Sequence, residues 1–257
     1  MARDSVVESE ELRAILHVDP HRRRHYEEQR LWSNDTLTLW LEANASRAGD
    51  ALAAISGDRE VSYQELLKSS ESFAGGLRSL GVRSGDVVSI QLANSIEFLI
   101  AYFGIARLGA VVSTVHLPYR TSEIRTLLHH AESVAFIAVS DQKGFCPVTE
   151  ALALKAELPA LKHVISLGRS VAGATDLTAL LARSQSQALF DRPVASDPFL
   201  LLFLRKNSRK CAARRSGTSP RSIRYDSVGR RLHASAGPIQ LALGDGSRSD
   251  ERSLSGV

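Results

Sequence analysis

Apolar and polar positions follow two alternating rhythms between residues 35 and 204 of the chain. Short runs that are apolar on both sides, such as AFIAV at 135–139, predict buried strands. The longer segments between them carry apolar residues every three or four positions and predict helices. Strands that alternate with helices pair in parallel through crossover connections. The pattern therefore predicts an α/β fold, with a partial doubly wound, mostly parallel sheet and helices on both of its faces.

The expected elements are defined by these two rhythms and by the turn residues between them. A hairpin is expected at 51–63, and further strands at 86–92, 110–115, 133–139, 163–167 and 198–203. Helices are expected at 5–19, 33–49, 63–80, 95–109, 121–132, 148–157 and 176–184.

Local signals place the ends of several elements. The Ser-Gly-Asp run at 56–58 suits a tight turn between two strands. Ser62 followed by Glu65 forms the S-x-x-E capping box that opens a helix, and Gly81 is a typical helix end.

Two further helix starts have alternative caps. The helix at 33–49 has Asn34 or Asp35 as its candidate N-cap, and the helix at 121–132 has Thr121 or Ser122. Each of these side chains carries an oxygen that can accept a hydrogen bond from the first turn, so the pattern leaves both choices open.

The chain divides into three parts. Residues 1–34 form an amino-terminal helical segment in which Pro20 ends the first helix, and residues 35–204 form the α/β unit. The charge run HRRRH at 21–25 is interpreted as solvated surface rather than an anion site. Residues 205–257 lose every periodic signal and contain 10 Arg and 10 Ser, so they are expected to form a disordered basic tail.

The charge of the chain is divided between these parts. The tail holds 12 Lys+Arg and 4 Asp+Glu, a net of +8, which leaves 20 basic and 24 acidic residues and a net of −4 before it. A basic tail binds polyanions weakly and without sequence preference, and a single aromatic residue, Tyr225, provides no stacking platform. Specific nucleic-acid binding is therefore not expected.

Composition points to a soluble globular protein, with 44% apolar residues and no apolar stretch of membrane-spanning length. The Met-Ala-Arg-Asp start lacks the layout of a signal peptide, so no membrane span and a cytoplasmic location are expected. Cys146 and Cys211 have no CxxC partner and are interpreted as two reduced thiols.

Several motifs occur in a fixed order within residues 61–138. They are S-Y-x-E-L, L-G-V-x-x-G-D-V-V, N-S-x-E-F, G-x-x-x-x-G-A-V and E-I, and DPFLLLF follows at 197–203. In this order and spacing the chain resembles the amino-terminal part of the adenylate-forming (AMP-binding) superfamily, in particular an acyl-CoA or fatty-acid–CoA ligase. The likeness extends less sharply over residues 35–203.

This resemblance implies a reaction class. Such enzymes use ATP and Mg²⁺ to activate a carboxylic acid as acyl-AMP and then pass the acyl group to a thiol, usually that of CoA. In the family, the strand that resembles DPFLLLF runs directly into a phosphate loop, T-S-G-T-T-G-x-P-K. Glycines let backbone N–H groups approach the phosphates, hydroxyls donate further hydrogen bonds, and a lysine adds charge.

The chain departs from the family at this loop. Phe203 is followed by Leu-Arg-Lys-Asn-Ser-Arg-Lys-Cys, which contains no glycine, and the SGTSPR run at 216–221 lacks the second glycine and is detached from the strand. The chain is therefore interpreted as truncated before the phosphate loop and inactive. No catalytic, cofactor-binding or metal-binding residue is assigned, and no cofactor is expected.

The abrupt change after residue 204 suggests a frameshifted reading frame. One choice of codons for LRKNSRKCAAR, read one base over, gives S-G-K-T-P-A-N-A-P-R, which resembles a variant phosphate loop. A genuine short paralogue with a new tail is the alternative. Two other functions stay open, which are a non-catalytic partner of full-length relatives and a weak, nonspecific nucleic-acid binder.

A few single residues are candidates for a site. His116 lies in the loop after a strand, where ligand sites of α/β proteins gather, and is interpreted as a structural or surface histidine. His129 and His130, at a helix end, are interpreted as capping or solvated, and Asp86 as a turn acid before a strand. Two glycines are interpreted as a close-packing position and a helix stop: Gly104 and Gly109.

Overall fold

The computed structural model of the chain describes residues 19–33, 35–183, 193–195 and 197–203. The helix expected at 5–19 and the tail at 205–257 lie outside the described residues, apart from Asp19. The helices are α2 (Pro20–Glu28), α3 (Leu37–Ala48), α4 (Tyr63–Ser79), α5 (Ile96–Arg107), α6 (Thr121–His130), α7 (Pro147–Leu154) and α8 (Leu177–Arg183). The strands are β1 (Leu52–Ser56), β2 (Arg59–Ser62), β3 (Val87–Gln91), β4 (Val111–Thr114), β5 (Ala135–Val139), β6 (His163–Leu167), β7 (Thr175–Asp176) and β8 (Leu200–Leu201).

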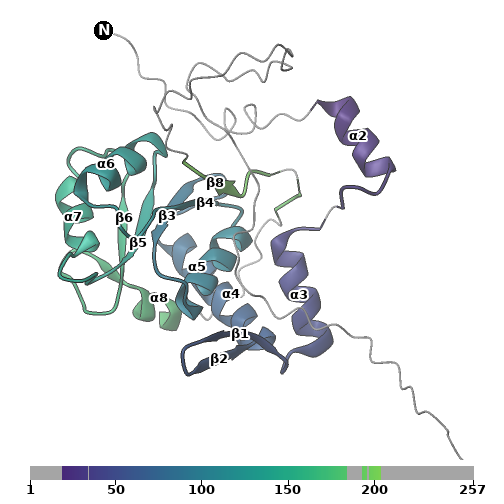
Figure 1. The fold of residues 1–257 in the computed structure, drawn as a ribbon, viewed down its shortest axis with the longest axis horizontal. Helices are drawn as coiled ribbons and strands as arrows, with labels where there is room; N and C mark the ends of the chain where they lie inside the picture. The colour runs from purple at the N-terminus through teal and green to yellow at the C-terminus, as the bar shows by residue number, and fades with distance from the viewer. Residues whose placement is uncertain (1–18, 34, 184–192, 196, 204–257) are drawn as a thin grey trace, which may run out of the picture.

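Six of these strands form one parallel sheet in the order β7-β6-β5-β3-β4-β8 (Figure 1). The central strand β3 pairs in parallel with β4 on one side and β5 on the other, so Val88 lies between Val112 and Ala135. The outer pairs β4–β8, β5–β6 and β6–β7 are parallel as well. The predicted α/β class and parallel sheet are confirmed.

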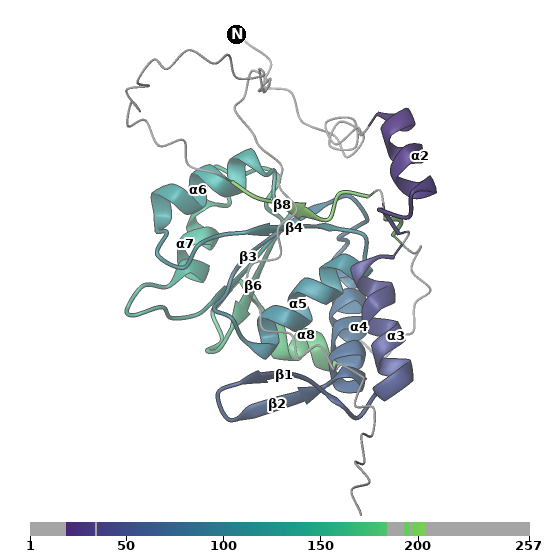
Figure 2. The ribbon, with the colours of Figure 1, turned by 45° about the vertical axis from the view of Figure 1, so that its right-hand side comes forward.

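Helices cover both faces of the sheet. Figure 2 shows α3, α4, α5 and α8 on one side and α6 and α7 on the other. On the first side, Phe73 and Leu77 of α4 and Ile105 of α5 pack in one buried cluster with Val88 and Ile137 of the sheet. The doubly wound arrangement follows from strands that are apolar on both faces.

The second face has its own core. Ile124 and Leu128 of α6 and Val148 of α7 pack against Phe136 of β5 and Val164 of β6, and all five side chains are buried. Alternate side chains of β5 therefore pack into the two cores, because successive side chains of a strand point to opposite faces.

Strands β1 and β2 form a separate antiparallel hairpin beside the helices of the first face. Gly57 in its turn has φ +61°, a conformation that glycine adopts without strain. The Ser62 hydroxyl accepts from the Glu65 N–H at 3.3 Å, and the Glu65 carboxylate accepts from the Ser62 N–H at 2.9 Å. The predicted turn and capping box are both confirmed.

The caps predicted for two other helices are wrong. Thr36 caps α3, because its hydroxyl accepts from the Leu39 N–H at 3.2 Å, while Asp35 lies one residue too early. Helix α6 begins after Arg120, whose N–H donates to the Glu123 carboxylate at 3.2 Å. Thr121 is the first residue of the helix and not its cap, and its hydroxyl donates to Glu150 of α7 at 2.7 Å.

Three further boundaries differ from the prediction. Pro20 opens helix α2, which was not expected, and Asp19 before it accepts from the His21 N–H at 2.8 Å, whereas the helix that Pro20 was predicted to end lies outside the described residues. The strand expected at 198–203 is hydrogen-bonded only over Leu200–Leu201, and the short strand Thr175–Asp176 was not expected. Helix α7 ends three residues before the predicted end at 157.

Candidate functional site

The carboxyl ends of the parallel strands meet at one edge of the sheet. In open α/β sheets ligands bind in the crevice outside this edge. The loops that follow β3, β4 and β5 all lie here, because these strands pair in parallel register. This edge is therefore the candidate site.

The loop after β4, residues 115–120, is fixed at this edge by two glutamines. The Gln91 amide, at the end of β3, donates to the carbonyls of His116 at 3.0 Å and Tyr119 at 3.1 Å. The amide of Gln142, in the loop after β5, donates to the carbonyl of Leu117. Backbone acceptors of one loop are thus paired with one side chain at the end of β3 and one in the loop after β5.

Arg120 completes this arrangement from within the loop. Its guanidinium donates to the carbonyls of Leu117, Pro118 and Tyr119 at 3.1 to 3.2 Å and lies 4.7 Å from the centre of the Phe145 ring. The Nη1 group of this guanidinium therefore holds the loop.

The loop presents one imidazole to solvent. His116 is exposed, and its ring meets the Tyr119 ring edge-on with the centroids 5.4 Å apart. The buried Oε1 atoms of Gln91 and Gln142 have no hydrogen-bond partner. His116 thus lies at this edge of the sheet as an exposed histidine, in agreement with its interpretation as a structural or surface residue.

The other candidates lie elsewhere. His129 and His130 are exposed in the last turn of α6. The Asp86 carboxylate accepts from the Arg83 N–H at 2.8 Å in the turn before β3, as predicted for a turn acid. Gly104 is a close-packing position, since a Cβ there would lie 2.8 Å from Phe73, and Gly109 ends α5 at φ +72°.

The remaining polar candidates form no site either. Cys146 is a free thiol that caps α7 by accepting from the Thr149 N–H at 3.4 Å, and Cys211 lies outside the described residues. The HRRRH run lies on α2, where His21, Arg22, Arg24 and His25 are exposed to solvent. Within the described ranges, no group of three His, Cys, Asp or Glu side chains could hold a metal ion.

Shifted pKa values do not mark a reaction centre. Burial lowers the pKa of His163 and raises that of Tyr102. The carboxyl of Glu65 has a lowered pKa because it accepts from Ser62. Burial raises the pKa of Glu97, but its bond with Arg59 outweighs this and the net pKa is lowered. Each group has a structural partner or a buried position that accounts for its shift.

Sequence reasoning missed the two glutamines and Arg120. Gln91 carried a signal, because it is a large polar residue at the end of a strand that is buried throughout. Gln142 lies in a loop and carried none. Their carbonyl partners become neighbours only when β3, β4 and β5 pair.

The comparisons with known proteins agree with this fold. Residues 41–203, more than half of the chain, match the family described as AMP-binding enzyme. The chain is 31% identical to triostin synthetase I of Streptomyces triostinicus, over 71% of this chain and 33% of that protein. It is 32% identical to the vibriobactin-specific 2,3-dihydroxybenzoate-AMP ligase of Vibrio cholerae, over 56% and 27%.

A solved structure has a similar fold. The apo structure of MbtA from Mycobacterium smegmatis matches with a TM-score of 0.66 and 26% identity, over 72% of this chain and 34% of that chain. The chain thus spans about a third of the length of these proteins. The chain belongs to the AMP-binding, adenylate-forming enzyme superfamily.

Proposed function

We propose that this chain supplies the amino-terminal sheet of an ATP-dependent, acid-activating ligase and does not by itself form an acyl-adenylate. The observation that carries this proposal is the course of the chain at β8. This strand pairs with β4, so it ends at the candidate site, and the sequence that follows Phe203 has no glycine for eight residues. A phosphate loop needs glycines where the backbone must approach phosphate oxygens.

The described side chains at this edge do not replace such a loop. Arg120 is engaged by three carbonyls, and the guanidinium of Arg169 pairs with Asp141 at 3.3 Å. The amides of Gln91 and Gln142 donate to the loop after β4. Electrostatic stabilisation of phosphates supplies much of the acceleration in phosphoryl-type chemistry, and these groups make their bonds with backbone carbonyls or, for Arg169, with a carboxylate.

The proposed substrate class is a carboxylic acid, without a choice between fatty and aromatic acids. The expected fatty acid is one possibility among several classes, since a relative is named as a 2,3-dihydroxybenzoate-AMP ligase. None of the helices in the described ranges has the length and apolar character needed to cross a membrane.

Pyrophosphate exchange tests this function directly. The purified full chain, incubated with ATP, Mg²⁺, labelled pyrophosphate and a panel of aromatic and aliphatic acids, should return no label to ATP. The Vibrio cholerae ligase with 2,3-dihydroxybenzoate serves as the active control, and a mock preparation from the same host controls for contaminating ligase. Acid-dependent exchange above the mock preparation would show that the chain is catalytic.

A second candidate is a non-catalytic partner of full-length relatives. Within the described residues β8 pairs only with β4, so its other edge has no partner strand there. A strand of another chain can add to such an edge. Phe199, Leu200 and Phe203 are partly buried apolar residues on and beside this strand.

A further inference from the structure

Helix α2 lies apart from the sheet. Figure 1 and Figure 2 both show it beyond α3, on the side of the molecule away from α6 and α7. Its Tyr26 side chain is half-buried, and the following side chains are exposed to solvent: His21, Arg22, Arg24, His25, Glu27 and Glu28. A helix of nine residues is marginal in water by itself, so contact with another surface is expected to stabilise it.

The charges of α2 oppose the dipole of the helix. Beyond its cap Asp19, the helix has no acidic residue in its first turn, while three arginines stand in its first half and Glu27 and Glu28 in its last turn. A helix is stabilised by acidic residues near its start and by basic residues near its end. Because the order here is the reverse, the pattern does not serve the stability of the isolated helix.

The same order is complementary to itself when two such helices run antiparallel. The basic first half of each helix then faces Glu27 and Glu28 of the other, and the two helix dipoles also oppose each other. Tyr26 stands between the basic and the acidic half, so it lies near the two-fold axis of such a pair. A parallel pair would instead place arginines against arginines.

The turn after α2 adds an apolar part to this surface. Arg30 adopts a left-handed backbone at φ +54°, and the Leu31 N–H donates to the Tyr26 carbonyl at 2.8 Å. The Trp32 ring lies against the Tyr26 ring with the centroids 5.2 Å apart. Leu31 and Trp32 are still 67% and 42% exposed. Tyr, Trp and Arg are the residues most enriched at the energetic centres of protein interfaces, which favours a protein as the partner.

The charge balance disfavours a polyanion as the partner. Residues 19–33 contain four arginines and three acidic residues, a net of +1 with neutral histidines. Binding to a nucleic acid or an anionic membrane grows with the number of basic residues at the surface, and acidic residues among them oppose it. A surface that carries both signs is the better match.

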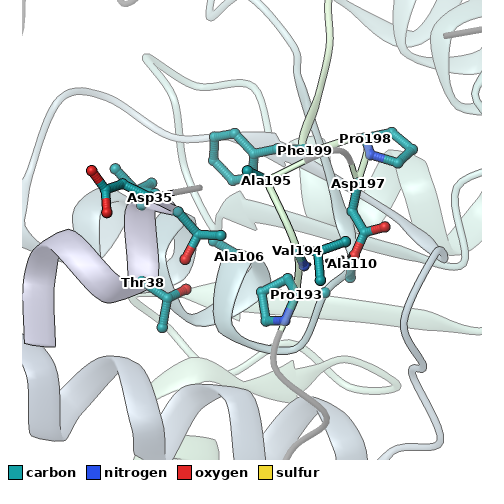
Figure 3. A pocket seen from close by; sticks show the side chains of 13 residues that line it. Asp35, Thr38, Ala106, Ala110, Pro193, Val194, Ala195, Asp197, Pro198 and Phe199 are labelled. Atoms are coloured by element: carbon teal, nitrogen blue, oxygen red, sulfur yellow. Dashed lines mark hydrogen bonds between the residues drawn. The ribbon is translucent and has the colours of Figure 1, made fainter. Parts of the chain in front are cut away.

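The cavity at the first turn of α3 is no counterpart for the charged half of α2 (Figure 3). Its volume is about 190 Å³, and most of its wall is apolar, including Ala106 and Phe199. Figure 3 shows the Asp35 carboxylate directed away from the cavity, and the Asp197 carboxylate accepts from the Val194 N–H at 3.0 Å within its own loop. The α2 helix of a second copy therefore matches these arginines better than this cavity does.

We propose that α2 is a self-association surface, through which two copies of this chain pair with their α2 helices antiparallel about a two-fold axis. Arg22 and Arg24 of each copy lie against Glu27 and Glu28 of the other, and the Tyr26 rings lie near the axis. The helix is about 14 Å long, so the surface is small and the dimer is weak. Because α2 lies outside the family match at 41–203, this pairing is independent of acid activation.

Sedimentation velocity of the purified full chain over a series of concentrations tests this proposal. The wild-type chain should change from monomer to dimer as its concentration rises. Arg22→Glu with Arg24→Glu, and Glu27→Arg with Glu28→Arg, each place like charges across the axis, so each variant alone should need at least about a tenfold higher concentration to dimerise. An equimolar mixture of the two variants should dimerise again. Both variants also agree with the helix dipole, so loss of the dimer does not follow from loss of the helix.

Lys68→Glu with Arg83→Glu is the matched control, because it changes the net charge as much as the acidic variant does, at two exposed positions outside α2. It should dimerise as the wild-type chain does. A wild-type chain that stays monomeric over the whole series would overturn the proposal, and so would a mixture of the two variants that does not dimerise. Dimerisation of either variant alone at the wild-type midpoint would overturn it as well, since the contact would then lie elsewhere on the chain.

Discussion

His163, at the start of β6, shows how one side chain links stability to pH. Its imidazole is half-buried, and burial lowers the pKa of His163. The charges of Lys155 and Lys162 lower it further, although a hydrogen bond with the backbone of Leu80 opposes them. The folded chain therefore takes up a proton on this residue less readily than the unfolded chain does.

The expected result is a loss of stability in mild acid. An unfolded histidine has a pKa of about 6.5, so the contribution of His163 is complete above that pH and is lost as pH falls from there through the lower folded-state pKa. The free energy of unfolding, measured by urea titration, should fall over this range in the wild-type chain and less steeply in His163→Gln. His129→Gln removes an exposed imidazole as a control, and equal slopes for His163→Gln and the wild-type chain would contradict the assignment.

Residue roles were predictable from sequence where the partner is close along the chain. The bond between Ser62 and Glu65 spans three residues, and the turn at Asp86 uses the Arg83 N–H, so both follow from local pattern. Gln91 instead bonds carbonyls 25 and 28 residues away. Such a pairing depends on the order of the strands, which no local pattern contains.

At the scale of the elements, Arg107 joins helix α5 to helices α3 and α4. It lies in the last turn of α5, and its guanidinium pairs with Glu42 of α3 and with Glu71 of α4 at 2.8 Å. The Arg107 side chain is 20% exposed, so water screens these pairs only in part.

Replacing Arg107 with methionine should lower the free energy of unfolding by about 1–3 kcal/mol, because two partly buried carboxylates lose a charged donor. Urea unfolding measures this as a lower midpoint with an unchanged slope. The control is Arg59→Met, which breaks the pair with Glu97 at an arginine that is 64% exposed and should cost less than about 1 kcal/mol. Similar losses in the two variants would show that Arg107 does not connect the helices in this way.

The elements themselves were largely predictable, and their ends were not. Apolar periodicity located every helix and strand of the core between α3 and β6, because burial on one or two faces leaves a pattern in the sequence. The start of α3 at Thr36 depends on which of three adjacent polar residues adopts an extended backbone. Strand β7 has two residues, and among the described strands it pairs with β6 alone, so it is too short to carry a pattern.

At the scale of the whole molecule, the chain combines a described α/β unit with a sequence segment of opposite charge. The family and the parallel sheet were predictable because ordered motifs extend over almost eighty residues. The frameshift interpretation of residues 205–257 and the cytoplasmic location stay predictions. Association with other chains is the property of the whole molecule that the sheet itself suggests, since β8 lies at one edge of the sheet formed by the described strands.

The second candidate function predicts that the chain binds a full-length AMP-binding enzyme through the edge of β8. In size-exclusion chromatography the mixture should co-elute, and Leu202→Lys, directly after β8, should abolish co-elution because an edge lysine blocks strand addition. Leu31→Lys is the matched control, since Leu31 is 67% exposed after α2 and its replacement removes apolar surface away from the sheet. Separate elution of the wild-type chain and the enzyme would exclude the partner function, and equal loss in both variants would indicate nonspecific apolar adhesion instead of pairing at β8.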